Sequence, residues 1–136
     1  NELIQFGTLA NNDTIWEPSS MNVKVNHFDC GFDHLIILTI NDNKVYSMGK
    51  NNMFQCSHVS NKNLSKLTKI NLDSFNVDVR SVHCGINNTI LIVNKKNSIT
   101  NDLIIWGNNI DSGSILYTKN VVRYPKLIQS KQILSN

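Results

Sequence analysis

A cysteine and a histidine lie four positions apart in the segment CGFDHLIILT, at Cys30 and His34. This pair could supply half of a zinc site, which needs about four ligands in tetrahedral reach, or a thiolate and its base. A second Cys-Gly occurs at Cys84 after His83, but Asn88 stands where the second copy of the pattern would need its histidine. We therefore interpret Cys30 as a small packed residue, and His34 as a side chain that hydrogen-bonds the backbone of its turn.

Other signatures of chemistry are missing from the sequence. It has neither a Walker-type phosphate loop nor a glycine-rich dinucleotide fingerprint. His27, His58 and His83 lie at no telling spacing from a carboxylate or another histidine, so we interpret them as surface or hydrogen-bonded polar residues. We predict a non-enzymatic protein without a catalytic residue, a cofactor or a metal site, with a cysteine-dependent enzyme as an alternative.

Composition narrows the class of protein further. The chain has 136 residues and a net charge of +3, and Lys95 and Lys96 are its only adjacent basic pair, whereas nucleic-acid binders cluster such residues. The chain has three cysteines, Cys30, Cys56 and Cys84. A secreted disulfide scaffold usually has more cysteines, in an even number, so this count argues against that class. No apolar run is long enough for a membrane span. We therefore disfavour a nucleic-acid ligand and predict an intracellular protein of the nucleus or cytoplasm.

The chain repeats itself with an offset of 54 residues. Val25–Gly31 aligns with Val79–Gly85, sharing Val, Cys and Gly. A second signature follows each copy, at Val45–Gly49 and at Leu103–Gly107, and a third instance of it opens the chain at Leu3–Gly7. Because self-similarity at a fixed period marks a repeat architecture, we expect the chain to begin partway through one unit and to traverse a full one.

Each unit contains short apolar runs bounded by Gly, Asn and Asp, a pattern typical of β-strands. Runs such as Leu35–Leu38 are apolar at every position, which indicates strands buried on both faces. Gly31 and Gly85 are predicted at tight reversals and Asn41–Asn43 at a hairpin turn, while Leu64–Leu72 fits either a strand or a helix. The expected strands fall near residues 24–30, 34–40, 44–48 and 65–71, then near 79–84, 88–93, 102–106 and 121–128.

Four strands in each unit predict an all-β fold of β-propeller blades, each of four antiparallel strands. We expect a partial blade at residues 1–23, a full blade at about 24–72, a further blade at about 77–128 and the start of the next at 129–136. Two blades alone would expose open apolar edges. We therefore expect a partial propeller, or a fragment of a larger one, or partner chains that cover its ends.

The repeat motifs can be followed residue by residue. The first copy contains Cys30, Gly31, His34, Leu38, Thr39, Val45, Tyr46, Gly49, Asn51 and Gln55. The second contains Cys84, Gly85, Trp106, Gly107 and Asn109. This pattern resembles the repeat of the regulator of chromosome condensation family, which runs Cys-Gly-x-x-His, Leu-Thr, Val-Tyr-x-Trp-Gly-x-Asn and Gly-Gln-Leu-Gly. The chain departs from that repeat at Asn43, Met48, Phe54, Cys56 and Asn88, so it resembles a divergent member. Propellers of that family usually have seven blades, so the resemblance implies a fragment of a seven-bladed propeller.

The best candidates for a binding role lie in connecting segments, because loops on a rigid scaffold carry binding. The turn Asn94–Asp102 is four residues longer than its counterpart in the first copy and contains Lys95, Lys96 and Asp102. It fits either a partner-binding loop or an insertion without function. Trp16 could be an exposed hot spot or could be buried against the blade edge. Trp106, at the end of a repeat strand, is interpreted as core.

These observations predict a non-enzymatic protein-interaction scaffold that presents loops to a protein partner, such as a small GTPase or a larger complex. The family resemblance implies an alternative function, guanine-nucleotide exchange on a Ran-like small GTPase. In exchange members of that family, loops on one face of the propeller engage the GTPase.

Overall fold

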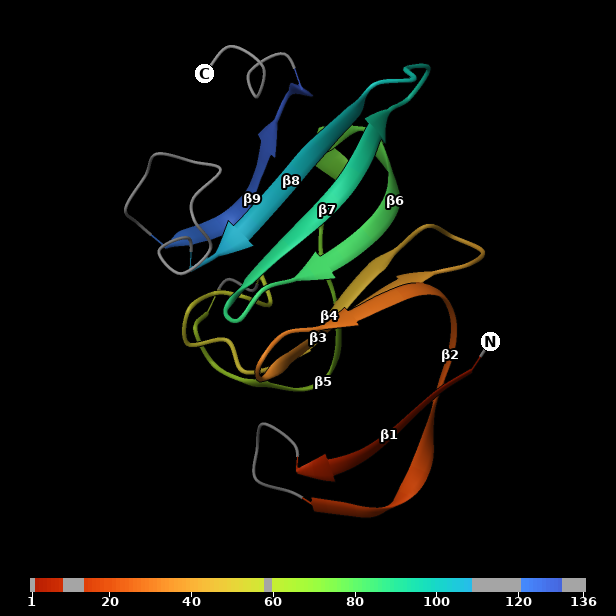
Figure 1. The fold of residues 1–136 in the computed structure, drawn as a ribbon, viewed down its shortest axis with the longest axis vertical. Coiled ribbons are helices and arrows are strands. Elements are labelled where there is room, and N and C mark those ends of the chain that lie inside the picture. The colour runs from red at the N-terminus through yellow and green to blue at the C-terminus, as the bar shows by residue number, and fades with distance from the viewer. Residues whose placement is uncertain (1, 9–13, 58–59, 109–120, 131–136) are drawn as a thin grey trace.

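The computed structural model describes residues 2–8, 14–57, 60–108 and 121–130, and these residues form an almost purely β fold (Figure 1). Strands of the first sheet pair in the order β1-β2-β3-β4-β5 and those of the second in the order β6-β7-β8-β9, all antiparallel to their neighbours. The strands are β1 (Glu2–Thr8), β2 (Thr14–Cys30), β3 (His34–Thr39), β4 (Val45–Gly49), β5 (Leu64–Lys69), β6 (Val77–Cys84), β7 (Asn88–Lys95), β8 (Asn101–Gly107) and β9 (Val122–Ile128). A short 3₁₀ turn, η1 (Asp73–Phe75), precedes β6. The predicted all-β architecture of antiparallel, blade-like sheets is therefore confirmed: the second sheet has the predicted four strands, and β1 adds a fifth strand to the first sheet.

Most of the expected strands appear within a few residues of their predicted bounds. The ambiguous segment Leu64–Leu72 contributes strand β5, because the edge of β4 pairs with it through Tyr46↔Lys69 and Gly49↔Leu64. The largest difference is β2, which begins ten residues earlier than expected, at Thr14 rather than residue 24. Its first half pairs with β1 and its second half with β3, so one long strand serves two neighbours.

Two kinds of glycine shape the turns. At Gly31 and Gly85 the backbone N–H donates to the carbonyl three residues later, at 2.8 and 3.0 Å, and a Cβ would lie 2.1 Å from a side-chain atom of His34 or Asn88. These tight reversals confirm the prediction. Gly49 adopts a φ of +117°, a left-handed conformation that favours glycine, at the end of β4.

The two sheets share one hydrophobic core. Ile36, Leu38 and Val45 contribute from the first sheet, and Leu91 and Ile104 are among the contributors from the second. On β3, Ile36, Ile37 and Leu38 are all fully buried, as the uninterrupted apolar run predicts. Burying such a side chain stabilises the fold by about 1.5–3 kcal/mol, so packing between the sheets sets the positions of the loops at their ends.

Candidate functional site

A chain of buried hydrogen bonds connects the two sheets, and we call it the buried bridge: His34, Thr89, Gln55 and Trp106. The Trp106 indole N–H donates to the backbone carbonyl of Gln55 at 2.7 Å, and the Thr89 hydroxyl donates to the same oxygen at 2.9 Å. His34 Nε2 lies 3.0 Å from the Thr89 oxygen. Because the Thr89 proton is directed at Gln55, we assign the imidazole proton to Nε2, so that His34 donates to Thr89.

The buried bridge uses His34, the histidine of the Cys-His pair, in a structural contact. His34 begins β3 in the first sheet, whereas Thr89 on β7 and Trp106 on β8 belong to the second. The prediction that His34 bonds the backbone of its own turn is wrong, because its ring reaches across to the other sheet. The prediction that Trp106 is core is confirmed, since only 1% of it is exposed.

Burial controls the charge of His34. Desolvation lowers the pKa of its imidazole, and the backbone carbonyl of Asn88 and the carboxylates of Asp29 and Asp33 oppose this effect only in part. Nδ1 is buried and makes no hydrogen bond among the described residues. The folded protein therefore favours the neutral imidazole.

This preference predicts a pH-dependent stability that replacing His34 with Asn should reduce. Because the folded pKa lies below the unfolded value of about 6.5, the unfolded state binds the proton more readily, and stability is lost as pH falls below about 6.5. In denaturant unfolding at a series of pH values, the free energy of unfolding of the wild type should fall by at most about 1.4 kcal/mol per pH unit from this cause. In the His34→Asn variant, which copies Asn88 of the second repeat, this contribution to the pH dependence of the free energy of unfolding should be absent. Identical pH profiles for the two proteins would contradict the assignment.

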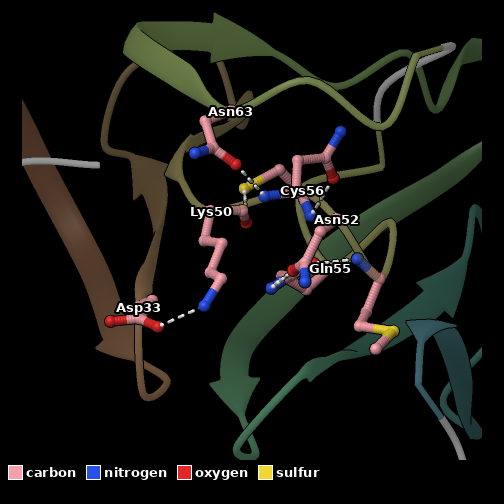
Figure 2. A network of polar contacts seen from close by, with 8 residues as sticks. Asp33, Lys50, Asn52, Gln55, Cys56 and Asn63 are labelled. Carbon is pink, nitrogen blue, oxygen red and sulfur yellow. Dashed lines mark hydrogen bonds and ion pairs between the residues drawn. The ribbon is translucent and has the colours of Figure 1, made fainter. Parts of the chain in front are cut away.

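The loop after β4 positions the backbone carbonyl of Gln55 so that it accepts the hydrogen bonds of Thr89 and Trp106. Asn51 is fully buried, and its side-chain oxygen accepts from the Cys56 N–H at 2.9 Å. Lys50 forms an ion pair with Asp33 at 3.2 Å, so the loop is tied to the turn before β3. Figure 2 shows these two side chains pointing toward each other, with Gln55 and Cys56 in the adjoining loop. The Gly-x-Asn and Gln residues of the repeat motif thus have a structural role: they fix the loop after β4 and its contact with the second sheet.

The cysteines divide into covered and open thiols. Cys84 donates its N–H to Asp29 at 2.9 Å and lies against the backbone of β2. Burial raises the pKa of Cys84 and of Cys56 to about 12, so both thiols are protonated at neutral pH and are poor nucleophiles. The prediction that Cys30 is packed is wrong: it is exposed, because among the described residues no strand covers it as β2 covers Cys84.

Sequence reasoning missed a pair of histidines from neighbouring sheets. The rings of His27 on β2 and His83 on β6 have their centroids 5.6 Å apart, and His27 Nδ1 accepts from the Val82 N–H at 3.4 Å. The 54-residue offset could have indicated this proximity, since it aligns β2 with β6. Within the described part of the chain, however, no group of three or more His, Cys, Asp or Glu side chains could hold a metal ion.

The structure separates the residues that were predicted to bind a partner. Lys95 and Lys96 are exposed where β7 ends and its turn begins. Asp102 is instead buried, with 4% exposed, and accepts a hydrogen bond from the backbone N–H of Ser130 at 2.9 Å. Trp16 lies in β2, and its side chain is outside the described part of the structure. The two lysines therefore remain as surface candidates.

A polar cleft of about 240 Å³ opens beside Lys96. The β3–β4 turn, the segment after β5, the start of β6 and the β7–β8 turn all contribute to it. Among the described residues, none of its charged side chains forms an ion pair within 4.0 Å with another residue of the cleft. The charged residues of the cleft are Asp42, Lys44, Lys69, Asp73, Asp78 and Lys96. This end of the molecule thus presents charged side chains of both signs that form no ion pair with one another in the described part of the chain.

Comparisons with known proteins agree with this architecture. Residues 25–55 match the family described as Regulator of chromosome condensation (RCC1) repeat. The matched segment runs from the second half of β2 to Gln55, and so includes two members of the buried bridge. A search of curated proteins finds no match to the sequence.

Among solved structures, human WBSCR16 has a similar fold, with a TM-score of 0.66 and 22% sequence identity. The similarity covers 91% of this chain but only 31% of that one, so the chain spans about a third of the human structure. Among the described residues, no helix has the length and apolar character needed to cross a bilayer. From the family match, the chain carries a divergent RCC1-type repeat at residues 25–55, and its sheets and structural relative place that repeat in a partial β-propeller fold.

Proposed function

We propose that the protein is a non-enzymatic interaction scaffold, whose paired sheets hold exposed loops in fixed positions for a protein partner. The observation that carries this proposal is the contrast between the two kinds of polar residue. The motif side chains His34 and Trp106 are buried in the bridge, whereas the cleft carries charged side chains of both signs that form no ion pair with one another among the described residues. A surface of both signs recognises a partner by complementary charges, which contribute specificity and association rate.

The setting that suits this scaffold is inside the cell. Cys30, Cys56 and Cys84 are all free thiols, and disulfides are rare where glutathione and thioredoxin keep thiols reduced. The proposed contact residues are Lys95 and Lys96, because they are exposed on the turn that adjoins the cleft.

Charge reversal of both lysines should weaken partner binding. Tagged wild-type protein, the double variant Lys95→Glu/Lys96→Glu and the control Lys62→Glu/Lys66→Glu would be used to capture partners from cells that produce the protein. The control removes the same charge at exposed positions near and on β5. We expect a partner retained by the wild type and the control, and bound at least about tenfold more weakly by the Lys95/Lys96 variant in a purified titration. Equal affinities for all three proteins would rule out this surface.

The repeat match favours one further candidate, guanine-nucleotide exchange on a Ran-like small GTPase. In that case the cleft end would face the nucleotide pocket of the GTPase. The protein would then accelerate release of fluorescent GDP from such a GTPase in a concentration-dependent way. A release rate that stays at the intrinsic value would exclude exchange and leave the scaffold proposal standing.

A further inference from the structure

The two sheets are joined by side chains of the first sheet that bind the backbone of β6. The Asn43 side chain, on the β3–β4 turn, accepts from the Val79 N–H at 2.8 Å and donates to the Val79 carbonyl at 2.9 Å. Farther along β6, His27 and Asp29 of β2 accept hydrogen bonds from backbone N–H groups of the same strand. We call this junction the β2–β6 seam. Asn43 and Val79 also line the polar cleft, so their contact fixes the distance between two of its walls.

Beneath its charged rim, the cleft has an apolar floor. Val45, Ile70 and Val79 belong to the hydrophobic core, and Leu72 and Val77 are half-buried against that core. The charged residues of the cleft are exposed or half-buried. Among charged side chains, arginine and lysine combine a long apolar stem with a charge at its end, and they commonly lay that stem along apolar surface. The cleft therefore has the layout that suits a basic side chain.

The carboxylates of the cleft are held more firmly than its ammonium groups. Asp42 accepts a hydrogen bond from the Thr39 hydroxyl, and the Asp73 N–H donates to the Asn71 side chain at 3.0 Å. Asp78 lies on β6, directly before the residue that is bound at the seam. A single methylene joins an aspartate carboxylate to the backbone, whereas a lysine ammonium lies at the end of a flexible four-carbon stem. A cation that enters the cleft therefore meets fixed carboxylates, while the lysines can swing away from it.

We propose that the cleft receives an arginine side chain of the protein partner. The aliphatic stem lies on the apolar floor, and the guanidinium contacts the carboxylates of Asp42, Asp73 and Asp78 at the rim. Arginine suits this site better than lysine, because its planar fork of N–H donors can bind more than one carboxylate oxygen at once. An acidic residue beside the arginine then meets Lys96. The inference rests on the proposed scaffold function and specifies the partner segment, an arginine next to an acidic residue.

Capped dipeptides test the arginine site without a known partner. Heteronuclear NMR titrations of the protein would compare acetylated glutamyl-arginine amide with acetylated glutamyl-norleucine amide, which keeps an apolar stem and lacks the cation. For the arginine peptide we expect saturable shifts of the Asn76 and Asp78 backbone signals at concentrations up to about 10 mM. The norleucine peptide should bind about tenfold more weakly, because it forms no ion pairs. Equal affinities for the two peptides, or no saturable shift at the cleft, would overturn the proposal.

Two substitutions that remove charges of opposite sign provide a matched comparison. Asp78→Asn removes one carboxylate and should weaken binding of the arginine peptide about threefold, the effect of losing one exposed charge pair. Lys69→Gln neutralises a lysine of the same cleft, so the affinity should stay the same or rise. Both side chains are exposed, and surface substitutions of this kind change stability little. An equal loss of affinity in both variants would show that the carboxylates do not select the arginine, which contradicts the proposal.

The peptide titrations and the charge reversal of Lys95 and Lys96 fail independently. If neither peptide binds while Lys95→Glu/Lys96→Glu weakens capture of a partner, the arginine site is wrong and the scaffold proposal stands. If the arginine peptide binds as expected while the lysine variant binds its partner as the wild type does, the arginine site stands and the lysine surface is excluded.

Discussion

Replacing Trp106 with alanine is expected to lower the free energy of unfolding by about 3–5 kcal/mol, the usual cost of truncating a large buried aromatic side chain. Trp106 is 1% exposed and belongs to the core shared by both sheets. The substitution also removes one of the two donors to the Gln55 carbonyl. Since a small domain is stabilised by only about 5–15 kcal/mol, this variant should be among the most destabilised.

Urea unfolding followed by far-ultraviolet circular dichroism measures this effect. Trp106→Phe separates its two components, because phenylalanine keeps most of the apolar volume and loses only the indole N–H. We expect a cost of about 1–3 kcal/mol for this variant, the penalty of a weakened buried hydrogen bond plus imperfect packing. A Trp106→Ala variant within about 1 kcal/mol of the wild type would contradict the placement of Trp106 in the shared core.

Local patterns in the sequence were sufficient to predict most of the strands. Apolar runs bounded by turn residues mark β3, β4, β7 and β8, and the Cys-Gly repeat marks the reversals before β3 and β7. These features depend on neighbours in the sequence, and the 54-residue offset supplied the order of the units. The early start of β2 was missed because the segment TIWEPSS shows no apolar alternation, and its strand conformation follows from pairing with β1.

The site was less predictable, because its contacts are long-range. His34 on β3 hydrogen-bonds Thr89 on β7 of the other sheet, 55 residues away in the sequence. The acceptor at the centre of the buried bridge is the backbone carbonyl of Gln55, which no side-chain pattern reveals. Asp102 was expected in a surface turn, but β8 begins at Asn101, so the turn is shorter than predicted and the carboxylate is buried.

The exposure of Cys30 illustrates the same limit. Its position in the repeat is one that packs only when a neighbouring sheet lies against it. Cys84 has that neighbour in β2, and Cys30 has none among the described residues. An identical Cys-Gly motif therefore gives one covered thiol and one open thiol, and the difference arises from the arrangement of the sheets.

The central claim, that the two sheets pack side by side along the β2–β6 seam, is tested most directly by pulse alkylation of the three cysteines with iodoacetamide. Cys30 should be modified rapidly, because its thiol is exposed. Cys56 and Cys84 should react at least about a hundredfold more slowly, because their protonated, covered thiols need local opening of the fold. Peptide mass spectrometry assigns each rate, and in denaturant the three rates should become similar. If Cys84 in the native protein reacts as fast as Cys30, the packing of β2 against β6 that covers Cys84 would be contradicted.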